Sequence, residues 1–422
     1  MPTGIIYTSF NALSLCLSSD IPLLNRVFKA FAYRDFRIMW FGACTSSIGT
    51  LMQTFAQAWL VLQLSKSPFM LGLDSFLGSI PIVLFSLVGG VFADRTERQK
   101  LLLGSQFAQM ACAFLLAILF ATGVVQIWHI LMLSFVVGTA QSFGGPAYSA
   151  LIPTLVKAED LPNAIALNSI QFNVARVLGP MLGGVALVLG ASWCFSLNGI
   201  SFVAVIISLL IIHPHFVPTK SRESVFTSMK EGIHFIRSQA AMEALIVLAF
   251  SMTLLAFPLI VFLPVFAKDV FHGGPNLYTV FLVCSGIGSI CGALTVAGLG
   301  KHKHMGLLVL LMLMGLGVLI SGFAVSRNFV LSCVLIFLSG AMLLAVFTSI
   351  GSLVQMIAPD NMRGRVISVY NVAFRGGMPV GSLVVGALVK EFSAPVVLKW
   401  NGILLAILGL YFLFVQRKVA TL

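Results

Sequence analysis

The sequence predicts an all-α integral membrane protein in which twelve transmembrane helices form two six-helix pseudo-repeats. The first reason is composition: 59% of the 422 residues are hydrophobic and only 9% are charged, whereas soluble domains carry roughly 25% charged residues. Such a chain suits lipid, where every backbone polar group must be satisfied within the protein. With 16 prolines, 38 glycines and no alternating strand pattern, the spans are expected to be helices.

The second reason is the spacing of apolar runs. A helix needs about 20 mostly apolar residues to cross a bilayer, and twelve such runs are separated by turn residues or charges. They cover about residues 38–63, 69–93, 101–122, 127–152, 164–189, 194–212, 241–267, 277–299, 305–325, 329–357, 366–389 and 396–415.

The third reason is the distribution of basic residues. If the N-terminus is cytoplasmic, 18 of the 25 Lys and Arg residues lie in cytoplasmic segments and 5 lie outside. The remaining two, Arg176 and Arg375, fall within spans. Because cytoplasmic loops are rich in Lys and Arg, we expect a multi-pass protein of the bacterial inner (plasma) membrane with both termini cytoplasmic.

The longest polar stretch divides the predicted spans into two halves. The expected units are a cytoplasmic N-terminal extension (1–37), an N-terminal six-helix half (38–212), a central cytoplasmic loop (213–240), a C-terminal six-helix half (241–415) and a cytoplasmic tail (416–422). Within the loop, Ser228 to Gln239 mixes apolar and basic residues, as an amphipathic helix on a membrane surface does. Residues 155–161 resemble residues 356–362, which indicates an internal repeat of a kind found in transporters.

Several function classes are excluded by what the sequence lacks. There is no phosphate-binding G-x-x-x-x-G-K-[ST] loop, no nucleophile triad and no cluster of metal ligands, and the seven cysteines form no paired motif. The formal charge of +12 sits in short loops between apolar runs, so it indicates topology and not nucleic-acid binding. We therefore expect no enzyme, no cofactor and no bound metal. The expected partners are the lipid bilayer, a small-molecule substrate and protons, and the expected state is a monomer.

One motif lies where the second predicted span meets the third. Residues Gly90 to Lys100 read G-V-F-A-D-R-T-E-R-Q-K, which resembles the G-x-x-x-D-R-x-x-R-[KR] signature of the major facilitator superfamily except that Gln precedes the final Lys. Asp94 and Arg98 are spaced for pairing on a helix, and Gly90 permits close helix approach. The resemblance implies the major facilitator fold and a cytoplasmic latch made by Gly90, Asp94, Arg95 and Arg98. The alternative is a charged loop that only sets topology.

Two further stretches resemble the enterobactin-exporter-like branch of that superfamily, over about residues 34–415. One is the element Gly179-Pro180 with Gly183-Gly184, and the other is the loop that contains Arg363, Gly364 and Arg365. The branch includes siderophore exporters, macrolide-type efflux proteins and lysophospholipid carriers. The resemblance implies proton-coupled export of a siderophore or drug-like compound by alternating access. A lysophospholipid-flipping carrier and a non-transporting receptor or assembly protein are the alternatives.

Polar residues within the spans are the candidates for a substrate cavity between the halves. Polar side chains are costly in a membrane and usually face the bundle interior, although hydrogen bonding between helices is an alternative explanation. Gln53 and Gln57 share one helix face, as do Asn371 and Arg375. The full set is Gln53, Gln57, Asn168, Gln171, Arg176, Gln355, Asn371 and Arg375.

Asp74 is the candidate proton site, because it is the one acidic residue well inside an apolar run of the first half. Burial disfavours the charged form of a carboxylate, so such a group can take up a proton. An ion pair with Arg or Lys, or contact with outside water, are the alternatives. Arg176 and Arg375 either pair with Asp74, support the helices or bind an anionic cargo through the guanidinium.

Overall fold

The computed structural model describes residues 28–213, 225–299, 304–360 and 362–422, and these residues form helices and connecting turns with no strand. Most of the predicted N-terminal extension lies outside the described residues. Within helix α4, the same holds for the side chains of Leu87, Val91, Ala93, Asp94 and Arg95.

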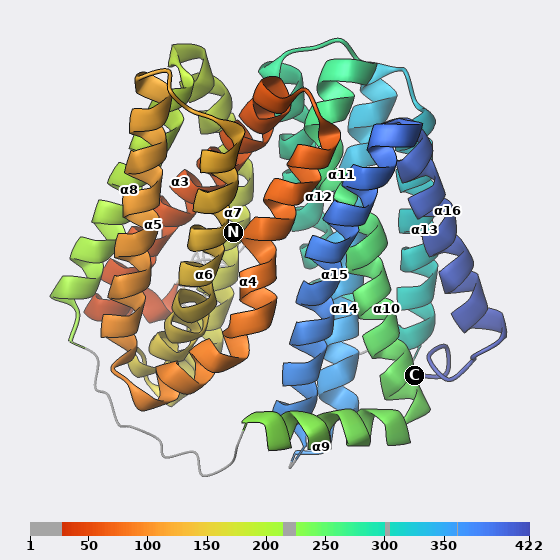
Figure 1. Cartoon of the computed structure of the whole chain (residues 1–422). Helices are drawn as coiled ribbons and strands as arrows, with labels where there is room; N and C mark the ends of the chain where they lie inside the picture. The colour runs from red at the N-terminus through yellow and green to blue at the C-terminus, as the bar shows by residue number, and fades with distance from the viewer. Residues whose placement is uncertain (1–27, 214–224, 300–303, 361) are drawn as a thin grey trace, which may run out of the picture.

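Six long helices make up the first half of the molecule (Figure 1). They are α3 (Arg34–Ser65), α4 (Pro68–Arg95), α5 (Arg98–Ala121), α6 (Ile127–Leu151), α7 (Leu161–Leu189) and α8 (Ala191–Ile211). Short 3-10 turns precede α3 (η1, Lys29–Ala32) and lie between α6 and α7 (η2, Ile152–Thr154, and η3, Ala158–Asp160). Each helix coincides with a predicted run to within a few residues.

The second half begins with a broken helix. Its elements are α10 (Ala240–Ala256), α11 (Pro258–Val265), a π-helical turn η4 (Phe266–Val270), α12 (Pro275–Leu299), α13 (Met305–Val325), α14 (Phe329–Ile357), α15 (Arg363–Phe392) and α16 (Ala394–Phe414). The sequence predicted one helix over 241–267, but the structure interrupts it at Phe257. Pro258 has no backbone N–H to continue the helical ladder.

Among the described residues, eleven helical segments are long and apolar enough to cross a membrane. Helix α3 is the long helix that falls outside this set, although its 32 residues would extend about 48 Å. Its sequence carries Thr50, Gln53, Thr54 and Gln57 within one stretch. Two of these polar residues, Gln53 and Gln57, are ones that the sequence assigned to a cavity.

An amphipathic helix lies across one end of the second half. Helix α9 (Val225–Ser238) runs roughly at right angles to the long helices (Figure 1), where the sequence predicted an amphipathic segment. It is fixed to the start of α15 by an ion pair between Glu231 Oε2 and Arg365 Nη1 at 3.0 Å. We refer to this end of the molecule as the α9 end.

A second ion pair holds the segment before α3 at the start of α7. Lys29 Nζ lies 2.7 Å from Asp160 Oδ1, and the Tyr33 hydroxyl donates to Asp160 Oδ2 at 2.8 Å. The hydrogen bond from Lys29, assisted by that from Tyr33, holds the pKa of Asp160 below its usual value. Asp160 is buried, so this contact anchors the entry to the first half.

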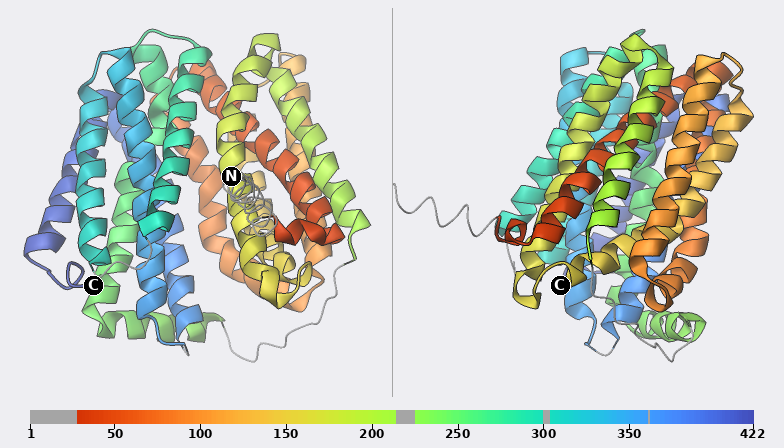
Figure 2. Two further views of the ribbon diagram at one scale, coloured as in Figure 1. Left: turned by 180° about the vertical axis from the view of Figure 1, so that it is seen from behind. Right: turned by 90° about the vertical axis from the view of Figure 1, so that its left-hand side faces the viewer.

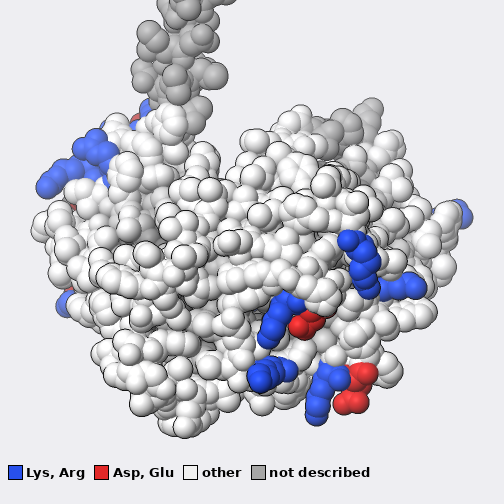
Figure 3. Space-filling view, turned by 90° about the horizontal axis from the view of Figure 1, so that it is seen from above, with Lys and Arg blue, Asp and Glu red and all other residues white. Residues whose placement is uncertain are grey.

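The two halves contact each other at the end away from α9. The hydroxyl of Ser75 in α4 donates to Ser382 Oγ in α15 at 3.2 Å, and Phe55 in α3 stacks on Tyr278 in α12 with ring centroids 4.8 Å apart. The ribbons lie farther apart toward the α9 end in both side views (Figures 1 and 2). Seen from the contacting end, the surface is mostly uncharged, with Lys, Arg, Asp and Glu confined to small groups (Figure 3).

Candidate functional site

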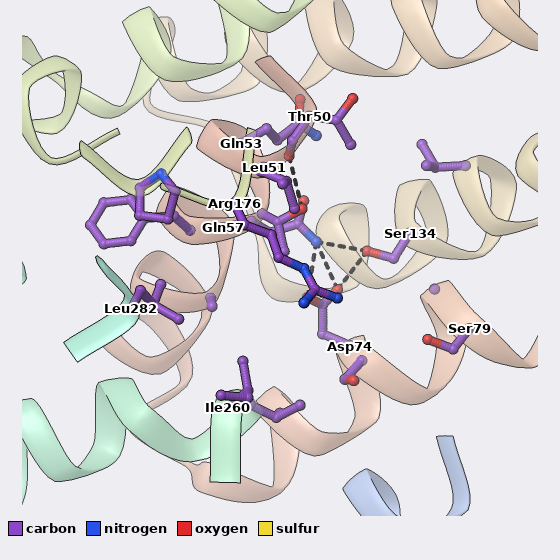
Figure 4. Close-up of a pocket in the computed structure, with 18 of the residues that line it drawn as sticks. Thr50, Leu51, Gln53, Gln57, Asp74, Ser79, Ser134, Arg176, Ile260 and Leu282 are labelled. Carbon is purple, nitrogen blue, oxygen red and sulfur yellow. Dashed lines mark hydrogen bonds between the residues drawn. The ribbon is translucent and has the colours of Figure 1, made fainter. Parts of the chain in front are cut away.

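A cavity of about 500 Å³ lies between the two halves (Figure 4). Helices α3 to α8 form most of its lining, and α11, α12 and α14 complete it from the second half. Its volume is within the range of small-molecule sites in proteins. Of the residues predicted for substrate or proton binding, Gln53, Gln57, Asp74 and Arg176 line this cavity.

Asp74 accepts hydrogen bonds from two neighbouring helices. Gln57 Nε2 in α3 donates to Asp74 Oδ1 and Oδ2 at 3.0 and 2.9 Å, and the Ser134 hydroxyl in α6 donates to Oδ1 at 2.5 Å. Gln57 Nε2 also lies 2.9 Å from Ser134 Oγ. Only 9% of Asp74 is exposed, and no Lys or Arg of the described chain forms an ion pair with it. The carboxylate is thus stabilised by neutral donors, so a proton can be added without breaking an ion pair.

Gln53 belongs to a neighbouring hydrogen-bonded pair. Asn198 Nδ2 in α8 donates to Gln53 Oε1 at 2.6 Å, and both residues line the cavity. Because Asn198 is only 3% exposed, this contact also ties α3 to α8. Gln53 therefore serves helix packing at the cavity wall, which is the alternative that the sequence left open.

Arg176 is a cation without a counter-ion in the described chain. Its guanidinium carbon lies 5.1 Å from the centroid of the Phe172 ring, one helical turn earlier in α7. It forms no hydrogen bond or ion pair with the described residues, Asp74 included. In Figure 4 its side chain points into the cavity and its guanidinium overlaps the Asp74 carboxylate in the view, although no hydrogen bond or ion pair joins the two.

The polar groups of the cavity are unevenly distributed between the halves. The acidic, basic and amide side chains all come from the first half, whereas the second half contributes mostly apolar side chains. The apolar ones are Phe257, Ile260, Val261, Leu282 and Leu343. A molecule that fills the space therefore meets a polar wall and an apolar wall.

The other predicted cavity residues lie elsewhere. The Tyr148 hydroxyl donates to Asn168 Oδ1 at 2.7 Å and to Gln171 Oε1 at 3.2 Å, and Gln171 Nε2 donates to Ser47 Oγ at 3.0 Å. These contacts join α7 to α6 and α3. Gln355, Asn371 and Arg375 are exposed and do not line the cavity.

The Gly-Pro element of α7 packs closely against two helices. A Cβ atom added at Gly179 would lie 2.7 Å from Leu51 Cβ, and one at Gly183 would lie 2.6 Å from Phe55 Cδ1, both in α3. At Gly184 the added atom would lie 2.6 Å from Thr279 Oγ1 in α12, across the boundary between halves. Pro180 lines the cavity. The element thus allows α7 to approach both α3 and the second half.

The predicted latch is only partly described. A Cβ atom added at Gly90 would meet nothing within 4 Å, so no close helix contact occurs there in this conformation. The side chains of Asp94 and Arg95 lie outside the described set. Arg98 Nη1 donates to the carbonyl of Ala150 at 2.9 Å, which ties α5 to the end of α6.

The loop before α15 carries the remaining predicted residues. Arg363 Nη2 pairs with Asp360 Oδ1 at 2.7 Å, and Arg365 makes the ion pair with α9 already described. Gly364 has open space beside its Cα. Both arginines therefore have acidic partners at the α9 end.

Several cavity residues were missed from the sequence, among them Ser134, Asn198 and Tyr278. Ser134 and Asn198 are single polar residues in apolar runs, and such residues usually indicate helix packing. Tyr278 was overlooked among many aromatic residues, yet it is 3% exposed and stacks on Phe55 across the two halves.

Comparison with known proteins identifies the family. The family model described as "Transmembrane secretion effector" matches residues 26–421. The chain belongs to this major facilitator family. It is 24% identical over 370 residues to macrolide efflux protein A of Streptococcus pyogenes, covering 84% of this chain and 89% of the relative. It is 25% identical over 368 residues to the staphyloferrin A transporter of Staphylococcus aureus (86% and 91% covered) and over 376 residues to the enterobactin exporter of Salmonella typhi (85% and 86% covered).

Solved structures share the fold of this family member. A bacterial homologue of the human lysosomal transporter Spinster, in an inward-facing and occupied conformation, aligns with a TM-score of 0.75 at 12% identity, covering 92% of this chain and 97% of that one. A D-xylose–proton symporter aligns with a TM-score of 0.70 at 12% identity (90% and 99% covered). The predicted family, the all-helical membrane fold and the assignment to transporters and not enzymes agree with these findings.

Proposed function

We propose that this protein is a proton-coupled secondary transporter that exports a siderophore or drug-like small molecule across the bacterial inner membrane. The observation that carries the proposal is the position of Asp74, a buried carboxylate without a cationic partner among the described residues, in a cavity between two helical halves. The relatives named as efflux or export proteins support the direction of transport.

The proposed architecture has twelve spans in two parallel six-helix repeats, 38–212 and 241–415, with α3 as the most polar span. The central loop 213–240, the extension 1–37 and the tail 416–422 lie on the cytoplasmic side, and the protein works as a monomer. This orientation rests on the excess of Lys and Arg in those segments.

In that orientation the structure is inward-facing, because the halves contact each other at the end away from α9 and diverge toward it. Cargo then enters the cavity from the cytoplasm. The latch at Gly90, Asp94, Arg95 and Arg98 forms when the α9 end closes in the outward-facing state, and a proton on Asp74 favours the return of the empty transporter.

A strain lacking the gene, complemented with the wild-type protein or with Asp74→Asn, tests the function. Small molecules are measured inside cells and in the medium under iron-replete and iron-limited growth. We expect a chelator or drug-like compound to accumulate inside the deletion strain, and wild type but not Asp74→Asn to restore its export.

Two outcomes would contradict parts of the proposal. If Asp74→Asn still exports the compound against its gradient, Asp74 is not the coupling site. If no small molecule is redistributed but lysophospholipids change between the membrane leaflets, the lysophospholipid carrier is the better assignment. Ser79→Ala provides a matched control, because Ser79 lines the same cavity but makes no hydrogen bond with the described residues.

A further inference from the structure

We propose that the cargo is an amphiphilic organic anion whose negative group binds Arg176 and whose apolar body packs against the second half. This inference rests on the proposed transport function and specifies the chemical class of the cargo.

The unpaired guanidinium of Arg176 carries the argument for an anion. A cation in a membrane protein usually finds a carboxylate or backbone carbonyls, yet among the described residues Arg176 has the Phe172 ring beside its guanidinium and no hydrogen bond or ion pair. Its five N–H donors suit a carboxylate or another oxygen anion that accepts two hydrogen bonds. A positively charged cargo would be repelled by the same group.

Asp74 does not pair with Arg176 to neutralise its positive charge. Its oxygens already accept hydrogen bonds from Gln57 and Ser134, and it forms no ion pair within the described chain. It is also too well buried, at 9% exposure, to offer a large face to a cationic cargo. The group in the cavity that still lacks a partner is therefore the positive one.

The opposite wall determines the rest of the cargo. Ile260 and Val261 of α11, Leu282 of α12 and Leu343 of α14 line the cavity from the second half, beside the Phe257 ring. No acidic or basic side chain of the described second half lines it. A ring or aliphatic body fits this wall, because its burial removes apolar surface from water.

The cargo charge also supplies a driving force in the export direction. When Asp74 is ionised and a monoanionic cargo is bound, these two negative charges and the positive charge of Arg176 give the cavity a net charge of minus one. After release, protonated Asp74 and Arg176 leave one net positive charge. A membrane potential that is negative inside favours outward movement of the first state and inward movement of the second, by about 50-fold per charge at 100 mV.

Three probes with one body and different charges test the inference. Purified protein in lipid nanodiscs is dialysed to equilibrium against 4-biphenylcarboxylate, 4-biphenylcarboxamide or 4-biphenylmethylamine, with empty nanodiscs to subtract partitioning. We expect the carboxylate to bind about 10- to 100-fold more tightly than the amide, and the amine to bind most weakly. Arg176→Gln should abolish the preference for the carboxylate, and Arg176→Lys should retain part of it.

Matched variants separate a charge effect from loss of folding. Arg237→Gln removes one positive charge on the exposed surface of α9 and should bind like wild type. Asp74→Asn should bind the carboxylate at least as tightly as wild type, because a nearby negative charge is removed. The unfolding temperature of each variant is measured in the same nanodiscs.

The inference is overturned if wild type binds no carboxylate, does not prefer it to the amide, or keeps that preference in Arg176→Gln. These outcomes are distinct from failure of the proposed function. Arg176-dependent anion binding without transport would refute the proposed function but support the anionic cargo class. Asp74-dependent export of a cationic compound would support the proposed function but refute the anionic cargo class.

Discussion

The contact between Ser134 and Asp74 yields a measurable test of whether the carboxyl group is ionised. The Ser134 hydroxyl donates to Asp74 Oδ1 at 2.5 Å across two helices, inside a cavity where Asp74 is 9% exposed. A hydrogen bond to a charged group contributes about 1.5–3 kcal/mol, against about 0.5–1.5 kcal/mol between neutral groups. Ser134→Ala should therefore lower the free energy of unfolding by about 1–2 kcal/mol more in wild type than in Asp74→Asn.

The assay is a double-mutant cycle, with unfolding of the purified protein by a denaturing detergent followed by circular dichroism. Ser79→Ala is the control for Ser134→Ala. Ser79 lies on α4, the helix of Asp74, and lines the same cavity, but it has no hydrogen bond to Asp74 in the described structure. Additivity of Ser134→Ala and Asp74→Asn within about 0.5 kcal/mol would refute an ionised, hydrogen-bonded Asp74. The coupling should also decrease in acid as Asp74 takes up a proton.

Two other predictions concern packing and pH. Gly183→Ala should lower the unfolding temperature in detergent, because its Cβ would lie 2.6 Å from Phe55 Cδ1 and overpacking costs about 1–3 kcal/mol. Gly145→Ala is the control and should leave the unfolding temperature unchanged, because its Cβ would meet nothing within 4 Å. Equal unfolding temperatures of the two variants would contradict the α7–α3 contact. Because the pKa of Asp160 is lowered below its usual 3.8 by the bond from Lys29, this bond should protect the segment before α3 at neutral pH and lose its effect as the pH falls below about 4. Hydrogen exchange of residues 30–33 should be faster in Lys29→Ala than in wild type at pH 7, and this difference should shrink as the pH falls below about 4. Equal rates at pH 7 would exclude the role of the ion pair.

The helices could be predicted from sequence far better than the cavity. Lipid requires long apolar helices, so hydropathy indicates where the helices begin and end to within a few residues. It overlooked the interruption at Pro258, and α3 is too polar to count among the eleven apolar helices of the described residues. Gln57 was predicted from the sequence because it and Gln53 lie on one face of α3. Gln171 lies next to the face that Asn168 and Arg176 share and was predicted with them, yet Tyr148 and Ser47 satisfy its amide within the first half. Whether a polar residue faces a cavity or another helix depends on its neighbours in space, which the sequence does not contain.

The same reasoning explains why the two arginines within spans differ. Arg375 lies on α15, is exposed and does not line the cavity. Arg176 lies in the cavity, half-buried beside Phe172, and an unpaired charge there opposes closing of the α9 end around an empty site. On the return step the inside-negative membrane potential favours inward movement of this positive charge and offsets the penalty. An anion bound to Arg176 removes that penalty, so binding of cargo and closing of the α9 end become linked. A neutral cargo of the same shape would fill the cavity without providing this link, and it should therefore bind without being exported.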